Sequence, residues 1–226
     1  MIIFLIYCLL PSYWARNHSN KVLRKGQLHK KEVALTFDDG PNPDYTPRLL
    51  DILKEYGVTA TFFVMGKQAR LYPDIIKRMD EEGHTLGLHS YCHRHAWLMS
   101  PIATIRDMNQ TYHILEHILG KAPNWYRPPW GTFNLVSMFA ARKLNLNLAY
   151  WSIEAQDWAA RITVEHIHNT VIEKIHPGSI IVLHDNQGAP GAPEKTLKAL
   201  PIIIDTLHEK GYRFISLGEM KGAHYA

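Results

Sequence analysis

Residues 32–41 read EVALTFDDGP, a short apolar run that ends in two adjacent carboxylates, Asp38 and Asp39, and a Gly-Pro turn. The run contains β-branched and aromatic residues and has the length of a buried strand. A second run, SIIVLHD at residues 179–185, also passes from apolar to polar residues at its end. Buried strands that end in reactive side chains are typical of parallel sheets, because the carboxyl ends of such strands carry the active site.

The rest of the chain alternates between strand and helix patterns. Strands are predicted at 33–37, 60–64, 85–89, 125–127, 146–153, 179–184 and 213–217. Helices are predicted at 46–56, 72–82, 102–119, 135–143, 164–175 and 195–210. Gly57, Gly83, Gly120 and Gly211 follow four of the helices in the position of C-terminal caps. This order predicts an α/β fold, either a barrel or a doubly wound sheet, and about seven parallel strands favour an incomplete (β/α) barrel.

The composition fits one folded domain with no nucleic-acid partner. The chain has 226 residues, of which 46% are hydrophobic and 20% charged. The net charge of +4 and the pI of about 9.0 come from basic residues that are scattered along the chain. Such a surface tolerates anionic cell-wall polymers or lipid headgroups, but it carries no nucleic-acid recognition motif. Two cysteines exclude a disulfide scaffold, and a monomer is the default expectation.

The N-terminus is the most ambiguous stretch. Residues 1–14 read MIIFLIYCLLPSYW and are followed by the basic residues Arg16, Lys21, Arg24 and Lys25. The run is shorter than the about 20 residues of a membrane span, and it lacks the features of a signal peptide. We predict that residues 1–31 form an apolar arm or a membrane anchor with a basic linker, and that residues 32–220 form the main domain.

Two histidines and the carboxylate pair suggest a metal site. Adjacent carboxylates repel each other unless a cation or a basic group lies between them, which suggests one metal ligand and one base. An Asp-Gly-Pro turn with two solvated acids is an equal alternative. His89 and His93 are four residues apart, so a helical turn at 90–93 would place both imidazoles on one face. Imidazole and carboxylate together suit Zn²⁺ or a similar divalent metal. His113 and His117 repeat this spacing in the middle of a helix, where a surface or structural role is expected.

Arg127 and His184 are further candidates for the site. Arg127 precedes two prolines, whose rigid backbone can aim its guanidinium at a carboxylate, although a solvated arginine in a connector is the alternative. His184 ends the clearest buried strand, and Asp185 and Asp157 are its candidate partners. A carboxylate that orients an imidazole raises the pKa of that imidazole and suits it to acid catalysis, although a satisfied core histidine is the common alternative.

Together these motifs resemble the polysaccharide deacetylases of carbohydrate esterase family four, the NodB homology domain. The resemblance covers about residues 32–219 and rests on five motifs in the family's order: TFDDG at 36–40, HSxxH at 89–93, RPP with an aromatic residue and Gly at 127–131, Asp157-Trp158, and Leu183-His184-Asp185. It implies a deformed (β/α) barrel. Glu154 stands where the family often has Asp, and Trp130 where it usually has Tyr, so the shape of the groove and the substrate are expected to differ.

The resemblance also implies a role for each residue. Asp39, His89 and His93 match the metal ligands, with Zn²⁺ expected and Co²⁺, Ni²⁺ or Mn²⁺ as alternatives. Asp38 matches the catalytic base and His184 the catalytic acid. Arg127 matches the residue that tunes the base, and Asp157 the residue that orients the acid. Three further positions match the substrate groove, the acetyl pocket and the backbone donor to the oxyanion: Trp158, Leu183 and Trp130.

The activity implied is the metal-dependent removal of N-acetyl groups from N-acetylglucosamine-type residues of peptidoglycan or a chitin-like glycan. Three alternatives remain: a deformylase or deacetylase of a lipid-linked amino sugar, an esterase of O-acetylated xylan, and a non-catalytic glycan-binding module. An anchoring arm implies membrane association and a place outside the cytoplasm or at the cell wall. The basic residues after the arm favour the cytoplasmic face instead.

Overall fold

The computed structural model describes residues 2–17, 19 and 21–224, and its core is a parallel sheet that closes only in part. Within this range the sheet has nine strands in the order β1-β6-β5-β4-β3-β2-β8-β7, and β9 pairs with the start of β2. Every pairing is parallel, and the two outermost strands, β1 and β7, do not meet. The strands are β1 (Val22–Leu23), β2 (Glu32–Asp38), β3 (Thr61–Val64), β4 (Thr85–Leu88), β5 (Trp125–Tyr126), β6 (Asn147–Ala149), β7 (Ile153–Glu154), β8 (Ser179–His184) and β9 (Arg213–Phe214). The predicted incomplete (β/α) barrel is confirmed.

The sheet has more strands than predicted, and residues 146–153 explain part of the difference. These residues do not form one strand, because β6 pairs with β5 and β1 at one edge of the sheet while β7 pairs with β8 at the other. Between them the Tyr150 N–H donates to the carbonyl of Leu23, and the Ser152 N–H to that of Ile180. The segment therefore crosses from edge to edge. Its mostly apolar pattern conceals the crossing, because most residues of both halves are buried.

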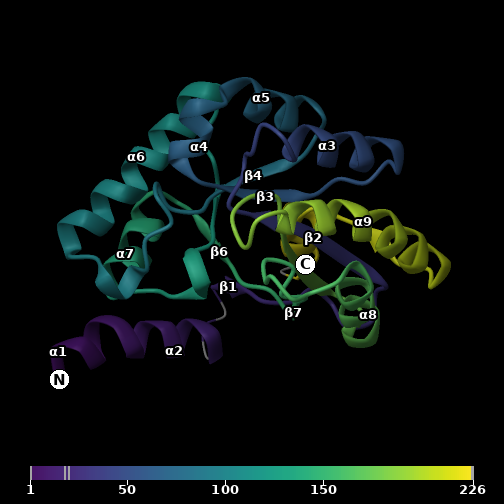
Figure 1. Ribbon diagram of the computed structural model, residues 1–226. Helices are drawn as coiled ribbons and strands as arrows, with labels where there is room; N and C mark the ends of the chain where they lie inside the picture. Colours follow the sequence, from purple (N-terminus) through teal and green to yellow (C-terminus); the bar gives the residue numbers. More distant parts are fainter. Residues whose placement is uncertain (1, 18, 20, 225–226) are drawn as a thin grey trace.

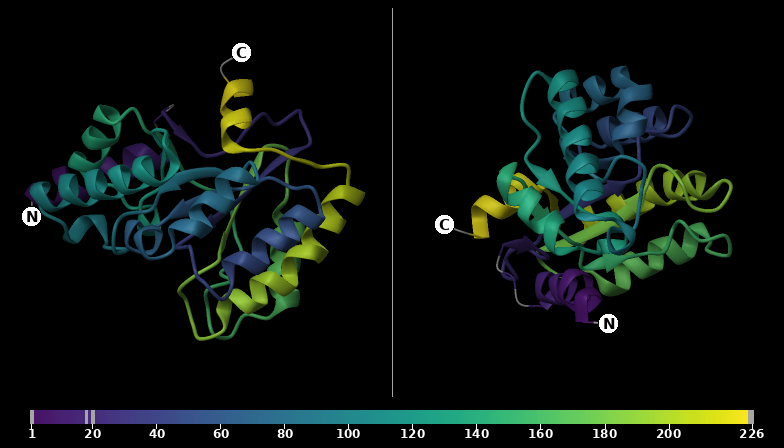
Figure 2. Two further views of the ribbon diagram at one scale, coloured as in Figure 1. Left: turned by 90° about the horizontal axis from the view of Figure 1, so that it is seen from above. Right: turned by 90° about the vertical axis from the view of Figure 1, so that its left-hand side faces the viewer.

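Helices cover the outside of the sheet (Figures 1 and 2). They are α3 (Thr46–Glu55), α4 (Gly66–Leu71), α5 (Pro73–Glu81), α6 (Pro101–Leu119), α7 (Leu135–Lys143), α8 (Val164–Lys174), α9 (Ala192–Glu209) and α10 (Leu217–His224), with two 3₁₀ turns, η2 (Ala96–Leu98) and η3 (Pro129–Gly131). Gly57, Gly83, Gly120 and Gly211 all have positive φ. They therefore end their helices as predicted, because glycine adopts this conformation without strain.

The core lies between the sheet and these helices. Phe37 of β2 and Phe62 of β3 are fully buried and stack with their ring centroids 5.2 Å apart. Leu49, Leu200 and Ile203 are also fully buried and bring α3 and α9 onto the same core. Burial of apolar surface on this scale is the main force that stabilises such a fold, and it fixes the ends of β2 and β8 side by side.

The first part of the predicted N-terminal arm is helical, whereas its later part contributes β1 to the sheet. The helical part consists of α1 (Ile2–Phe4), a π-helical turn η1 (Leu5–Leu9) and α2 (Leu10–Asn17), which lie beside α7 (Figure 1). The Ser12 hydroxyl donates to the Phe133 carbonyl at 2.7 Å and accepts from the Phe133 N–H at 3.0 Å and from the Trp97 indole N–H at 3.0 Å. In the described part of the chain, no helix is both long and apolar enough to cross a membrane. Of the predicted arm, residues 1, 18 and 20 lie outside the described residues.

Candidate active site

A cavity of about 400 Å³ opens at the carboxyl ends of the strands and collects most of the predicted site residues. Seven of them line it: Asp38, Asp39, His89, His93, Trp130, Trp158 and His184. They come from the ends of β2, β4 and β8 and from the loops that follow β4, β5 and β7. Because parallel strands end at one edge, residues far apart in sequence converge here.

Asp39, His89 and His93 form a compact group at the floor of this cavity. The Asp39 Oδ1 atom lies 3.3 Å from Nε2 of His89 and 3.0 Å from Nε2 of His93. Their ligand atoms all lie within 4.8 Å of one another, and they are the only such group among the residues that the structure describes. Three donor atoms this close can bind a single metal ion, and an open side remains for water and substrate.

The chemistry of these three side chains fits a cation. The Nδ1 atom of His89 lies 2.8 Å from the Arg127 carbonyl, which can only accept, so Nδ1 carries a proton. Asp39 Oδ1 is buried, and no donor reaches it with hydrogen-bond geometry. Burial opposes ionisation of Asp39, but the two imidazoles outweigh it and hold the pKa of this carboxyl below its ordinary value. An ionised, unsatisfied carboxylate oxygen beside two imidazole nitrogens is the donor set expected of a metal site.

The two histidines do not reach this position by helical spacing. Residues 90–93 form an irregular loop, not the helical turn that the four-residue spacing of His89 and His93 predicts. Ser90 and His93 both have positive φ, 66° and 53°, and so reverse the chain twice within four residues. The loop is held because the N–H of Gly66 donates to the Ser90 carbonyl and the N–H of Lys67 to the Tyr91 carbonyl. The imidazoles thus meet through loop geometry that spacing alone does not reveal.

Asp38 is buried beside Arg127. The Arg127 Nη1 atom donates to Asp38 Oδ1 at 2.8 Å and to the Thr36 hydroxyl at 2.8 Å, and its Nη2 donates to the Tyr150 carbonyl at 2.8 Å. Arg127 is fully buried, with its guanidinium carbon 4.2 Å from the centroid of the Phe63 ring. Burial lowers the pKa of Arg127, while Asp38 opposes that shift. Arg127 therefore lies behind Asp38 and fixes one of its oxygens.

His184 is paired with Asp157, on the wall of the cavity. Its Nδ1 lies 2.8 Å from Asp157 Oδ1, and its backbone N–H donates to Asp157 Oδ2 at 2.7 Å. Burial would lower the pKa of His184, but Asp157, with the more distant Asp39 and Asp38, raises it to about 10. The ring is therefore protonated at neutral pH.

The other candidate partner, Asp185, turns away from His184. Its Oδ2 accepts a hydrogen bond from the Thr46 hydroxyl at 2.5 Å. Burial, with the nearby charge of Asp39, raises the pKa of Asp185 to about 7. Of the two acids proposed for His184, only Asp157 has the required contact.

Two exposed tryptophans form the rim of the cavity. The Trp130 ring stacks on His95 with the centroids 5.1 Å apart, and it meets His93 edge-on at 4.3 Å. The Trp158 indole N–H donates to Glu154 at 3.3 Å, so the glutamate that departs from the family pattern orients this ring. Such faces can contact the rings of a sugar, whose C–H groups are apolar.

Leu183 and the histidine pair His113 and His117 do not line this cavity. Leu183 is fully buried in the core, and Val182 of the same strand lines the cavity instead. The assignment of Leu183 to substrate binding stays a prediction. His113 and His117 are exposed on α6, as expected.

Several residues that line the cavity were not predicted. They are Arg16, Trp151, Val182, Gln187 and Gly188, together with Glu154, at which the sequence differs from the family pattern. Arg16 comes from α2, and its guanidinium carbon lies 5.3 Å from the centroid of the Tyr150 ring. No motif could have indicated Arg16, because the docking of the arm brings it to the cavity. Gln187 and Gly188 lie in the loop after β8 and could be found by extending the last motif by a few residues.

Comparisons with known proteins identify the family of this chain. The sequence pattern of the family described as polysaccharide deacetylase matches residues 25–149. A peptidoglycan-N-acetylglucosamine deacetylase of Bacillus cereus is 37% identical over 93% of this chain and 74% of its own length. A chitooligosaccharide deacetylase of Azorhizobium caulinodans is 31% identical over 81% of this chain and 91% of its own. A crystal structure of a peptidoglycan N-acetylglucosamine deacetylase superposes with a TM-score of 0.85 at 35% identity, covering 92% of this chain and 94% of that one.

Proposed function

Because the chain belongs to the polysaccharide deacetylase family, we propose that its cavity removes N-acetyl groups from N-acetylglucosamine-type residues of a glycan, with Asp38 as base and His184 as acid. The observation that carries the proposal is the meeting of Asp38, Asp39, His89, His93 and His184 in one cavity. The reaction adds water to the amide and releases acetate and a free amine on the sugar.

Asp39, His89 and His93 would hold a divalent metal, which we propose is Zn²⁺, with Co²⁺, Ni²⁺ or Mn²⁺ as alternatives. The unsatisfied Asp39 oxygen and the His89 imidazole, oriented by the Arg127 carbonyl, support this assignment. When bound, such a metal lowers the pKa of water and polarises the amide carbonyl.

Asp38 is placed to take a proton from the attacking water. Its Oδ1 is held by Arg127, while its Oδ2 lies 3.9 Å from Nε2 of His89, on the side of the metal ligands. A base whose second oxygen faces the nucleophile needs no rearrangement before proton transfer. Arg127 acts through Asp38 and is a positioning residue.

His184 is placed to protonate the departing amine. Asp157 holds its Nδ1 and thereby leaves Nε2 as the nitrogen that donates. Thr196 donates to the same Asp157 carboxylate at 2.7 Å and fixes it in turn. The backbone N–H of Trp130 is the expected donor to the oxyanion, and its positive φ of 54° sets its direction.

Acetate release and metal content together test this proposal. Purified chain with added Zn²⁺ is incubated with N-acetylated chitooligosaccharides, peptidoglycan fragments, O-acetylated xylan and an N-formylated amino sugar, and the products are identified by mass spectrometry. Acetate release from N-acetylated substrates, lost in Asp38→Asn while zinc stays bound, supports it. Formate release, ester cleavage alone, or glycan binding without turnover would each favour one of the alternatives.

We also propose that the enzyme works outside the cytoplasm at a membrane or cell-wall surface, as a monomer, with residues 1–31 as the attachment. Exposed apolar side chains on the arm, among them Ile2, Ile6 and Leu10, support this. Fractionation of cells that express the full chain, compared with a variant that carries Ile2→Asp and Ile6→Asp, is the test. Recovery of both forms in the cytosol would contradict it.

A further inference from the structure

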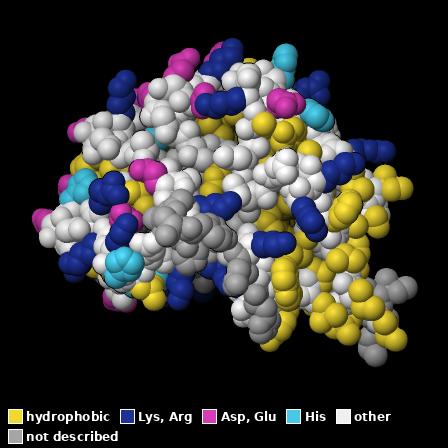
Figure 3. All heavy atoms as spheres, turned by 180° about the vertical axis from the view of Figure 1, so that it is seen from behind, with side chains coloured by type: hydrophobic (Ala, Val, Ile, Leu, Met, Phe, Trp, Pro, Cys, Tyr) yellow, Lys and Arg dark blue, Asp and Glu magenta, His cyan; other side chains and the backbone are white. Residues whose placement is uncertain are grey.

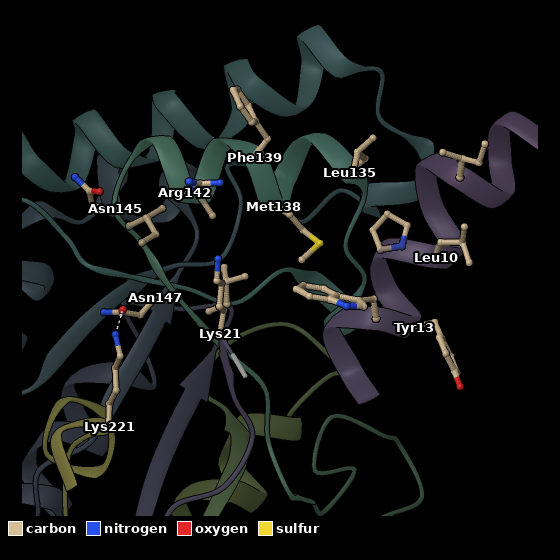
Figure 4. A pocket seen from close by; sticks show the side chains of 16 residues that line it. Leu10, Tyr13, Lys21, Leu135, Met138, Phe139, Arg142, Asn145, Asn147 and Lys221 are labelled. Atoms are coloured by element: carbon tan, nitrogen blue, oxygen red, sulfur yellow. Dashed lines mark hydrogen bonds between the residues drawn. The ribbon is translucent and has the colours of Figure 1, made fainter. Parts of the chain in front are cut away.

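A second and larger cavity lies between the N-terminal arm and α7. Its volume is about 1200 Å³. Pockets for small ligands typically have volumes of about 300 to 1,000 Å³, so this cavity is larger than most of them. Leu10, Leu135, Met138 and Phe139 line it, and Met138 points into its centre in Figure 4. We call this cavity the arm groove. Its size and apolar walls suit a long hydrocarbon ligand.

The arm is held by buried side chains and by the hydrogen bonds of Ser12, and it leaves other apolar side chains exposed at the arm groove. Cys8 and Ala15 of the same helical stretch are buried and do not line the groove. The exposed side includes Tyr13 and, on α7, Phe139, which is 64% exposed. Figure 3 shows hydrophobic side chains gathered at this end of the molecule, with Lys and Arg side chains next to them. A patch of this kind marks an interaction surface.

Cations are among the residues that line the arm groove, and acids are not. Lys21, Arg142 and Lys221 line it, and its lining contains no Asp or Glu. Lys221 is hydrogen-bonded to Asn147, but Lys21 and Arg142 have no ion-pair partner among the residues that the structure describes. Figure 4 shows both side chains directed into the same space. An anionic group beside a hydrocarbon chain would match this arrangement.

We propose that the arm groove binds an acyl chain of an anionic membrane phospholipid, with Lys21 and Arg142 at its phosphate. This lipid site rests on the proposed membrane attachment and is independent of the catalytic roles proposed for Asp38 and His184. It implies that the arm lies on the membrane surface rather than across it, and that the catalytic cavity works close to the lipid headgroups. Basic residues near an apolar face are what anionic bilayers attract.

A second copy of the chain is a poorer occupant. A twofold contact would place the same patch of each copy against the other, so the positive charges of one groove would face those of the second. The lining of the groove offers no acid to neutralise them. Lipid phosphate supplies the missing charge.

Vesicle co-sedimentation of the full chain tests the headgroup contact. Vesicles of phosphatidylglycerol and phosphatidylcholine should bind the protein more tightly than phosphatidylcholine alone, and added salt should weaken this binding. Lys21→Glu and Arg142→Glu should each reduce affinity about fivefold or more, the effect of losing one interfacial cation. Lys143→Glu is the matched control, because Lys143 neighbours Arg142 on α7 but does not line the groove. Equal losses in Arg142→Glu and Lys143→Glu would overturn the assignment.

The acyl chain is tested separately. Phospholipids brominated along the chain should quench the fluorescence of the wild type, and Trp14→Phe should remove most of that quenching, because Trp14 lines the groove. Phe139→Asp should abolish binding, whereas Ile202→Asp, an exposed apolar position on α9, should not.

Thermal unfolding and turnover of a soluble chitooligosaccharide show that each variant is folded. Loss of vesicle binding with turnover intact would support the lipid site and leave the catalytic proposal untouched. A wild type that binds no vesicle would overturn the lipid site. A wild-type dimer that Phe139→Asp converts to a monomer would also overturn it, because a second copy would then cover the groove.

Discussion

The catalytic cavity and the arm groove differ in how their charged side chains are buried and paired. In the catalytic cavity Asp38 is buried against Arg127, and His184 against Asp157, at distances of 2.8 Å. In the arm groove Lys21 and Arg142 are exposed at the rim of an apolar surface. Buried pairs are costly to desolvate but keep reacting groups fixed, whereas rim charges cost little and stay free for a ligand. One cavity is therefore built for fixed geometry, and the other for contact with a partner.

The largest expected difference is between two arginines. Arg127→Met leaves Asp38 buried without its partner, so the free energy of unfolding should fall by about 3–5 kcal/mol and turnover should be lost. Arg142→Met removes an exposed charge and should change the free energy of unfolding by no more than about 0.5 kcal/mol. Urea unfolding of both variants measures the difference.

A double variant sharpens this result. Asp38→Asn combined with Arg127→Met removes both charges, so part of the lost stability should return. Additive losses would mean that Arg127 stabilises the fold through Thr36 and Tyr150 rather than through Asp38.

The pair of His184 and Asp157 predicts a change in pH dependence. Asp157 raises the pKa of His184, so this imidazole, the proposed acid, stays protonated well above neutral pH. Asp157→Asn lowers that pKa, and the protonated fraction at alkaline pH falls with it. The alkaline limb of the kcat/KM profile should move toward neutrality, and turnover should fall by about 10²-fold.

The matched control for this profile is Asp185→Asn, since Asp185 does not contact His184 and bonds to Thr46 instead. A profile whose alkaline limb moves in Asp185→Asn but not in Asp157→Asn would reverse the assignment of the two acids.

The arm connects the two cavities, and Ser12 tests how tightly it is held. Ser12→Ala removes three hydrogen bonds and leaves the Trp97 indole N–H and the Phe133 N–H with one partner fewer, at a cost of about 1–3 kcal/mol. The arm should then become sensitive to proteolysis, and vesicle binding should weaken. Hydrogen exchange in α2 is the direct measurement, and unchanged protection would show that apolar packing alone docks the arm.

Much of the fold could be predicted because strong local patterns decide it. The strand at 179–184 and the helix at 135–143 have the predicted bounds. Residues 146–153 could not be predicted in detail, since an apolar run is compatible with one strand or with two at opposite edges. Strand pairing between residues that are distant in sequence decides between one strand and two. The hydrophobic periodicity of the segment does not indicate that pairing.

The site was predictable where reactive residues end a strand, as Asp38 and His184 do. It was less so in loops: His93 reaches Asp39 through positive backbone angles, not through a helical turn. Arg16 was missed altogether, because tertiary packing of the arm brings it to the cavity.

Arg16 gives the smallest expected effect and the closest test of whether the two cavities cooperate. It lines the catalytic cavity, while Trp14, two residues before it on α2, lines the arm groove. An exposed guanidinium gains little from one anionic group, so Arg16→Ala should raise KM about two- to fivefold for a glycan that carries carboxylates and leave kcat unchanged. KM for a neutral chitooligosaccharide should not change. An equal rise for both substrates would mean that Arg16 acts by holding Tyr150 and not by contact with the glycan, since its guanidinium lies against that ring.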